Sequence, residues 1–164
     1  MNRFIYSLML YFSVPFAILR LLLRDTHDSS WKRKLKNQLG IVQKISGQVI
    51  WIHCVSVGEF NASKPLIDKL FIQYSDHQIV VSTTTITGSI AVNKHYKSKV
   101  IHCFFPFDIP LIINSYVNKI NPEICILLET EIWPNLIQSL KKKSIPVVLI
   151  NARLSEKSFH RYYI

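Results

Sequence analysis

Glycine is scarce in this 164-residue sequence, and its cysteines and histidines lack the spacings of metal sites. With only 4 glycines, the chain has neither a Gly-x-Gly-x-x-Gly run nor a Walker-type phosphate loop, so dinucleotide binding finds no support. The 3 cysteines include no Cys-x-x-Cys pair, and the 6 histidines form no His-Glu-x-x-His motif. We therefore predict free thiols in a reducing compartment, with no metal site and no cofactor.

Acidic residues are also few. The chain has 10 Asp and Glu against 20 Lys and Arg, a formal net charge of +10. This excess predicts an anionic partner such as nucleic acid, a phosphorylated lipid or a membrane face, and the sign alone does not choose among them. The lysine run at 141–143 is better interpreted as a match to the dipole of a helix C-terminus than as a nucleic-acid patch. No nucleic-acid partner is therefore expected.

Residues 4–19 form an apolar run without a charge. A helix of about 20 residues is roughly 30 Å long, the thickness of a bilayer's hydrocarbon core. Only Arg3 precedes the run and many Lys and Arg follow it, so the positive-inside rule places the rest of the chain in the cytoplasm. We predict a membrane anchor helix over 1–24. Pro15 and Arg20 leave both a spanning and an interfacial helix open, and a helix packed on the soluble core is the alternative.

A basic, polar linker is expected over 25–48, followed by an α/β domain over 49–164. Hydrophobic residues make up 49% of the chain, which is ample for a core. Continuous apolar runs, typical of strands covered on both faces, alternate here with helical patterns. Strands are expected over 49–54, 78–82, 99–104, 124–128 and 146–150, and helices over 59–73, 88–96, 109–120 and 133–142. The pattern predicts a parallel sheet with crossover helices.

Polar residues follow several of these strands, and the carboxyl ends of parallel strands are where α/β proteins bind ligands. Ser56, Gly58 and Glu59 come after the first strand. One interpretation is a capping box, in which Ser56 and Glu59 bond to backbone N–H groups at a helix start. The other is a site in which Gly58 lets a sugar or phosphate approach the backbone and Glu59 is the general base for a hydroxyl. The spacing does not separate the two.

Candidate ligand-binding groups also follow the second, fourth and fifth strands, at three further turns that end a strand and are here called corners. Thr84 and Thr85 belong to a hydroxyl-rich segment suited to sugar hydroxyls or phosphate, and equally to a turn. Glu129 and Glu131 follow the fourth strand, where they and the threonine between them either cap the next helix or place two acids at the cleft. Arg153, after the fifth strand, is a partner for a glutamate in a structural ion pair or for an anionic ligand.

Together these corners resemble the Kdo transferases of Gram-negative bacteria, which transfer 3-deoxy-D-manno-octulosonic acid (Kdo). The motifs that carry the resemblance are Trp51-Ile-His-Cys-Val-Ser-Val-Gly-Glu59, Thr83-Thr-Thr-Ile-Thr-Gly-Ser89, Pro106-Phe-Asp108, Glu129-Thr-Glu-Ile-Trp-Pro-Asn-Leu-Ile137 and Ile145-Pro-Val-Val-Leu-Ile-Asn-Ala-Arg-Leu-Ser155. The resemblance implies the N-terminal half of a GT-B glycosyltransferase, whose two Rossmann-like domains face each other across a cleft. It further implies transfer of Kdo from CMP-Kdo to a lipid A precursor at the cytoplasmic face of the inner membrane.

On this resemblance, Glu59 is the base that deprotonates the acceptor hydroxyl and Glu129 stabilises the transition state. The basic residues after the anchor are expected to attract anionic head groups and the phosphorylated acceptor. Because the sequence stops soon after Asn-Ala-Arg-Leu-Ser, the donor-binding second domain is expected to be absent. A truncated reading frame, one half of a split enzyme with a separately encoded C-terminal half, and a fragment are all left open. The alternatives are a non-catalytic membrane-bound acceptor-binding fragment and a degenerate remnant.

Overall fold

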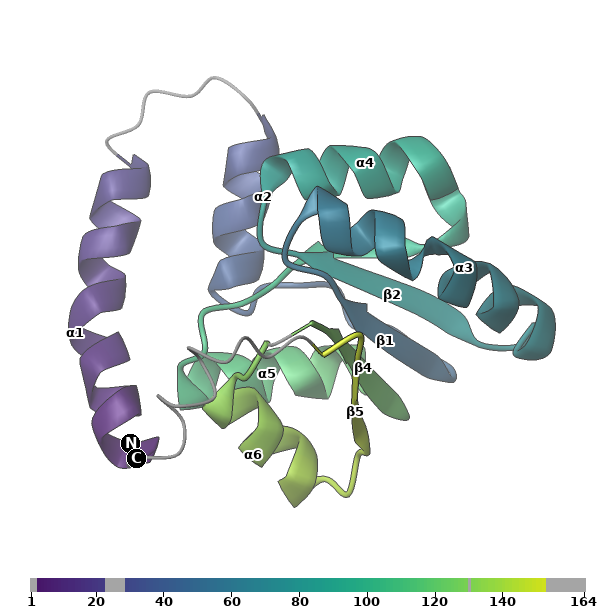
Figure 1. Cartoon of the computed structure of the whole chain (residues 1–164). Helices are drawn as coiled ribbons and strands as arrows, with labels where there is room; N and C mark the ends of the chain where they lie inside the picture. The colour runs from purple at the N-terminus through teal and green to yellow at the C-terminus, as the bar shows by residue number, and fades with distance from the viewer. Residues whose placement is uncertain (1–2, 23–28, 130, 153–164) are drawn as a thin grey trace.

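The computed structural model describes residues 3–22, 29–129 and 131–152, which form an α/β domain preceded by two helices (Figure 1). Its centre is a five-stranded sheet in the order β3-β2-β1-β4-β5, and every neighbouring pair is parallel. The strands are β1 (Val49–His53), β2 (Gln78–Thr83), β3 (Ile101–Phe104), β4 (Ile124–Leu128) and β5 (Val147–Ile150). The predicted α/β fold with a Rossmann-like parallel sheet is confirmed.

Helices cover both faces of the sheet, as continuous apolar strands require. They are α3 (Val57–Gln73), α4 (Ile86–Tyr96), α5 (Pro110–Ile120) and α6 (Pro134–Lys142), with a short 3-10 helix, η1 (Lys97–Lys99), after α4. α3 and α4 lie together on one face, and α5 and α6 lie together on the other (Figure 1). Because η1 takes up residues 97–99, the third strand begins at Ile101, later than predicted.

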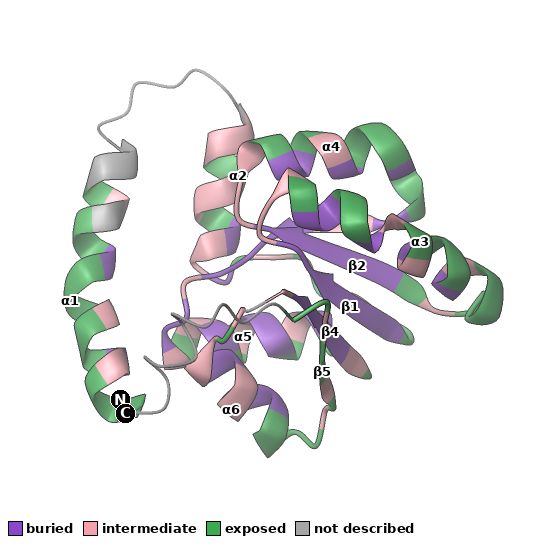
Figure 2. Cartoon of the chain, in the orientation of Figure 1, coloured by how far each residue is buried: buried purple, intermediate pink, exposed green. Residues whose placement is uncertain are grey.

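Each face of the sheet has its own apolar core, and β1, β2 and β4 are almost entirely buried, whereas the edge strand β5 exposes Val148 and Leu149 (Figure 2). Trp51, in the middle of β1, is fully buried, with its ring 5.6 Å from that of Tyr116 on α5. On the other face, Phe60 of α3 packs edge-on against Tyr96 of α4 with ring centroids 6.0 Å apart. Burying side chains of this size stabilises the fold by about 2–3 kcal/mol each. Cys54, Cys103 and Cys125 are buried free thiols, as predicted.

The N-terminal helix α1 (Arg3–Leu22) lies to one side of the sheet (Figure 1). Near its start, the buried Ser7 hydroxyl donates to the side-chain oxygen of Asn135 in α6 at 3.1 Å. Farther along, Phe12 and Phe16 are 70% and 74% exposed. Among the described residues, no helix has both the length and the apolarity that crossing a membrane needs. The predicted N-terminal helix is present, and its attachment to a membrane stays a prediction.

The expected basic linker contains a helix that the sequence analysis did not predict, α2 (Ser29–Gln38). Asn37, near its end, is buried: its side chain accepts from the Phe104 backbone N–H at 2.9 Å and donates to the Ile41 carbonyl at 3.1 Å. Gly40 then turns the chain with a φ of +76°, where a Cβ would lie 3.0 Å from the Ile112 carbonyl oxygen. The segment is therefore docked on the edge strand β3 and is not a free connection.

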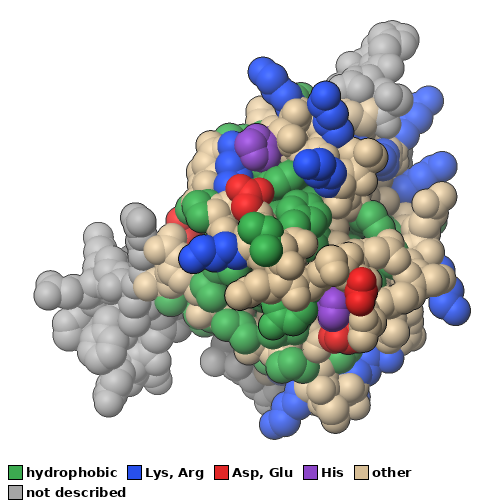
Figure 3. Space-filling model, turned by 90° about the vertical axis from the view of Figure 1, so that its right-hand side faces the viewer, with side chains coloured by type: hydrophobic (Ala, Val, Ile, Leu, Met, Phe, Trp, Pro, Cys, Tyr) green, Lys and Arg blue, Asp and Glu red, His purple; other side chains and the backbone are tan. Residues whose placement is uncertain are grey.

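Basic side chains are spread around the end of the molecule that carries the amino ends of the strands, where carboxylates are few (Figure 3). His77 and Glu123, which directly precede β2 and β4, approach within 3.2 Å there. The charge excess of the sequence is thus exposed at the surface, where an anionic partner can reach it.

Candidate active site

Three carboxylates gather at the carboxyl ends of β1 and β4, which are neighbouring strands in the middle of the sheet. Glu59 lies in the first turn of α3, and Glu129 and Glu131 follow β4. Burial raises the pKa of Glu59, and the negative charge of Glu129 raises it further. Burial also raises the pKa of Glu131, with the charge of Glu59 as the next cause. Sequence reasoning named all three residues, and the fold places them close enough for their charges to interact.

Glu59 is held by the backbone of its own corner. Its side chain is only 7% exposed, and one carboxylate oxygen accepts from the Val55 N–H at 2.5 Å. The other accepts from the Ser56 hydroxyl at 3.3 Å. Ser56 is the N-cap of α3, yet its side chain makes no capping bond to the helix, so the capping box is only half formed. A helix cap and a catalytic base are therefore compatible interpretations of this corner, because the bond to the backbone fixes the direction in which the carboxylate points.

Glu129 lies at a strained position of the backbone. Its φ is +58°, in the left-handed region that residues with a side chain seldom adopt. Its backbone N–H still donates to the Ile150 carbonyl at 2.9 Å, which continues the pairing of β4 with β5 by one residue. The extended conformation ends here, so the strand alternation that would point Glu129 and Glu131 the same way does not continue. Strain of this kind concentrates at functional sites.

The hydroxyl-rich turn after β2 supports the Glu59 corner. The Thr84 hydroxyl donates to the Val55 carbonyl at 2.9 Å, next to the N–H that binds Glu59. The Thr85 hydroxyl accepts from the Gly88 N–H at 3.0 Å and so caps α4. Both hydroxyls thus have structural partners, and their binding of substrate stays a prediction. Gly58 is exposed, and a Cβ there would meet only the Ser56 hydroxyl at 3.7 Å. Arg153 lies outside the described residues.

His53, in β1, has a ring nitrogen without a hydrogen-bond partner among the described residues. His53 is fully buried, and burial lowers its pKa to about 3, so the ring is neutral. Nδ1 lies 2.9 Å from the Ser82 hydroxyl and 3.2 Å from the Ser82 carbonyl oxygen, so Ser82 binds this nitrogen in either tautomer. Nε2 is buried with no partner among the described residues.

Trp133, just before α6, carries a second buried ring nitrogen. Its indole N–H has no hydrogen bond of normal geometry to any described residue, although it is close enough to the Glu131 carboxylate to oppose the rise in that pKa. The His53 and Trp133 rings meet edge-on with centroids 6.3 Å apart. Two buried ring nitrogens without a partner of normal geometry among the described residues therefore lie in neighbouring rings.

Asp108 is a structural residue that sequence reasoning did not single out by itself. Its carboxylate accepts from the backbone N–H groups of Asn135 at 3.0 Å and Leu136 at 2.8 Å, the first amides of α6. The N-cap residue, Trp133, makes no capping bond with its own side chain. The described acids after β4 therefore do not cap this helix, and Thr130 lies outside the described residues. The only sequence signal was an aspartate just beyond the third strand.

The carboxylate cluster predicts how stability depends on pH. The raised pKa values of Glu59 and Glu131 mean that the folded chain binds protons more tightly than the unfolded chain, so their stabilising contribution is complete below a pH of about 4.5. This contribution is lost as the pH rises through the raised values. Chemical denaturation of wild type and Glu59→Gln between pH 4.5 and 7.5 should show the variant gaining stability relative to wild type as the pH rises. Asp76→Asn, at an exposed turn, is the control. If the free energies of unfolding of Glu59→Gln and wild type changed with pH in parallel, this would contradict a raised pKa of Glu59 in the folded chain.

Comparison with known proteins assigns the family. A family model described as "3-Deoxy-D-manno-octulosonic-acid transferase (kdotransferase)" matches residues 30–164. The chain is 37% identical to 3-deoxy-D-manno-octulosonic acid transferase of Haemophilus influenzae, over 99% of this chain and 39% of that protein. It is 35% identical to a probable mitochondrial 3-deoxy-D-manno-octulosonic acid transferase of Arabidopsis thaliana, over 83% of this chain and 30% of that protein. The chain thus spans about two-fifths or less of the length of these relatives. It belongs to the Kdo transferase family of glycosyltransferases.

Proposed function

We propose that this chain forms the acceptor side of a Kdo transferase in lipopolysaccharide synthesis, with CMP-Kdo as donor and a lipid A precursor as acceptor. The observation that carries the proposal is Glu59, a buried carboxylate of raised pKa at the carboxyl ends of the central strands. A general base works best when its pKa lies close to the working pH, and a raised pKa brings a carboxylate closer to neutral pH. Family membership supplies the reaction in which that base acts.

In the proposed reaction, a hydroxyl oxygen of the acceptor attacks the anomeric carbon of Kdo. The bond from that carbon to the CMP phosphate breaks, and CMP leaves with the bonding electrons. The proton of the attacking hydroxyl passes to a carboxylate oxygen of Glu59. The Val55 N–H and the Ser56 hydroxyl hold this carboxylate in place before the acceptor binds. The charge of Glu129 makes Glu59 a stronger base, and in the transition state Glu129 orients cationic partners, because a bare carboxylate would repel the anionic donor.

The donor site belongs to a second domain in this proposal. A GT-B enzyme forms its active site between two domains, and this chain spans 39% of the length of its Haemophilus influenzae relative. We infer that CMP-Kdo is bound by a domain continuous with this chain or separately encoded. Ser56, Gly58, Thr84, Thr85, Glu131 and Arg153 are the proposed substrate-binding residues on the acceptor side.

A transfer assay tests the function. The chain is mixed with labelled CMP-Kdo and a lipid A precursor in detergent micelles, with and without the separately produced C-terminal half of the Haemophilus influenzae relative. Labelled lipid should form only when both halves are present. Binding of the lipid A precursor without transfer, despite an intact Glu59, would instead identify a non-catalytic acceptor-binding module. A chain without a cooperative thermal transition would be a degenerate remnant.

We also propose that α1 holds the chain at the cytoplasmic face of the inner membrane. Its exposed aromatic side chains and the basic residues after it are the groups that bind an anionic bilayer surface. In vesicle flotation, Phe12→Ser with Phe16→Ser should release the chain from vesicles that contain anionic lipid. The control replaces two equally exposed apolar residues elsewhere, Ile72→Ser with Leu111→Ser, and should float like wild type. Equal release of both variants would argue against α1 as the anchor.

A further inference from the structure

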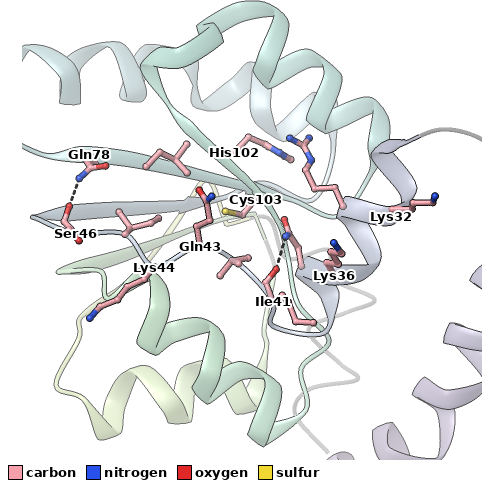
Figure 4. A pocket seen from close by; sticks show the side chains of 14 residues that line it. Lys32, Lys36, Ile41, Gln43, Lys44, Ser46, Gln78, His102 and Cys103 are labelled. Atoms are coloured by element: carbon pink, nitrogen blue, oxygen red, sulfur yellow. Dashed lines mark hydrogen bonds between the residues drawn. The ribbon is translucent and has the colours of Figure 1, made fainter.

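A cavity of about 920 Å³ lies beside the edge strand β3, between α2, the segment 41–46 and the start of β2. We propose that this cavity binds a phosphate monoester group. It is separate from the carboxylate cluster: β3 is two strand positions from β1 and three from β4, roughly 10 and 14 Å, and the cavity reaches toward the amino ends of the strands. Figure 4 shows Gln43 and Cys103 near its middle.

The charge around the cavity has one sign. Lys32, Arg33 and Lys36 reach it from α2, and Lys44 reaches it from the segment 41–46. In Figure 4, Lys44 lies on the opposite side from Lys32 and Lys36, and the nitrogen ends of Lys32 and Lys44 extend outward, so these cations stand at the rim of the cavity on two sides. Among the described residues, no aspartate or glutamate lines it. Lysine and arginine side chains carry only donors and a phosphate carries only acceptors, so this lining suits a compact anion.

The walls are fixed before any ligand arrives. Asn37 bonds to both the Phe104 N–H and the Ile41 carbonyl, which ties α2 and the segment 41–46 to β3. Lys119 donates to the Gly40 carbonyl at 2.9 Å, and the Gln78 side chain bonds to the Ser46 carbonyl. A site held in this way loses little conformational entropy when a ligand binds.

Arg33 is held in place by neutral partners, and no carboxylate of the described residues contacts it. One of its nitrogens donates to the Ser89 hydroxyl at 2.9 Å, and its guanidinium carbon lies 5.4 Å from the centre of the Phe104 ring. These partners are neutral, and an arginine fork has further N–H groups for a phosphate. His102, on the cavity wall, is neutral because burial and then Arg33 lower its pKa to about 3. Cys103 is a protonated thiol because burial raises its pKa to about 11.

The test compares two charge-matched double variants of the whole chain. The cavity variant is Lys36→Gln with Lys44→Gln, and the control is Lys69→Gln with Lys94→Gln, two exposed lysines on α3 and α4. Glycerol 3-phosphate is titrated calorimetrically at fixed ionic strength as the soluble monoester. Vesicles with and without phosphatidic acid present the same group on a lipid. Because the cavity variant loses two charged hydrogen-bond donors, it should bind at least about tenfold more weakly than wild type, and the control should bind within about twofold of wild type.

Each outcome is decisive. A one-to-one isotherm for glycerol 3-phosphate that only the cavity variant weakens supports the site with a soluble ligand. A loss of binding confined to the cavity variant and to phosphatidic acid vesicles supports the site with a lipid head group. Equal weakening of both double variants would show general charge attraction and overturn the proposal. So would wild type and the cavity variant binding both probes alike.

Discussion

Glu59→Gln is expected to lower Kdo transfer by about 10²–10⁴-fold in the two-half assay, the usual contribution of a general base. The change removes the proton acceptor and keeps the shape of the side chain. The glutamine oxygen still accepts from the Val55 N–H, so the corner and the first turn of α3 are retained. Thermal unfolding followed by circular dichroism should therefore show a variant at least as stable as wild type at neutral pH, because a desolvated charge beside Glu129 has gone.

Glu123→Gln is the matched control for this prediction. Glu123 lies at the opposite end of the sheet, just before β4, and its side chain is 52% exposed. This variant should transfer Kdo at the wild-type rate. Turnover of Glu59→Gln equal to that of Glu123→Gln would remove Glu59 from the mechanism. A variant that binds the lipid A precursor as wild type does, yet fails to transfer Kdo, would localise the defect to the chemical step.

Asp108→Asn is expected to destabilise the chain by about 3 kcal/mol, which for a protein of this size lowers the melting temperature by roughly 6–12 °C. The carboxylate accepts from two backbone amides of α6 and from the Tyr6 hydroxyl of α1, and these bonds oppose the rise in its pKa that burial causes. An asparagine has one acceptor oxygen in place of two, so its amide NH₂ group would face a buried N–H donor. The change thus removes the cap of one helix and loosens the attachment of another.

Asp76→Asn serves as the control for Asp108→Asn, because Asp76 is exposed in the turn between α3 and β2. Its free energy of unfolding should stay within about 0.5 kcal/mol of wild type. Urea denaturation of both variants measures the difference. A loss of less than about 1 kcal/mol in Asp108→Asn would mean that water replaces the carboxylate at the start of α6 and that the cap contributes little.

The sheet was predictable because each strand is a continuous apolar run, and such runs have few stable arrangements other than a parallel sheet covered on both faces. The cluster of Glu59, Glu129 and Glu131 was predictable for the same reason, since residues that follow neighbouring parallel strands meet at one edge. The pairing of Glu59 with the Val55 N–H was partly predictable as a local cap. Its burial was not, because burial depends on how the β2 turn closes over the corner.

Other features depend on contacts between residues far apart in the sequence. Asp108 caps a helix that begins 26 residues later, at Pro134, and no local pattern reports such a bond. α2 is polar and basic along its length, so its sequence reads as a linker, and only the docking of Asn37 on β3 makes it part of the domain. The left-handed backbone at Glu129 likewise lies where β4 ends beside β5, a strand more than 15 residues later in the sequence, and no local pattern reports it.

The order of the strands also affects how the chain folds during synthesis. Ile50 of β1 pairs with Ile79 on one side but with Ile124 on the other, so one edge of the first strand gains its neighbour only after the residues up to β4 have been synthesised. Until then the nascent chain exposes unpaired backbone N–H and C=O groups flanked by apolar side chains. Such a strand edge can pair with another chain. We therefore expect the yield of folded protein to depend on chaperones that cover this strand edge until β4 has been synthesised.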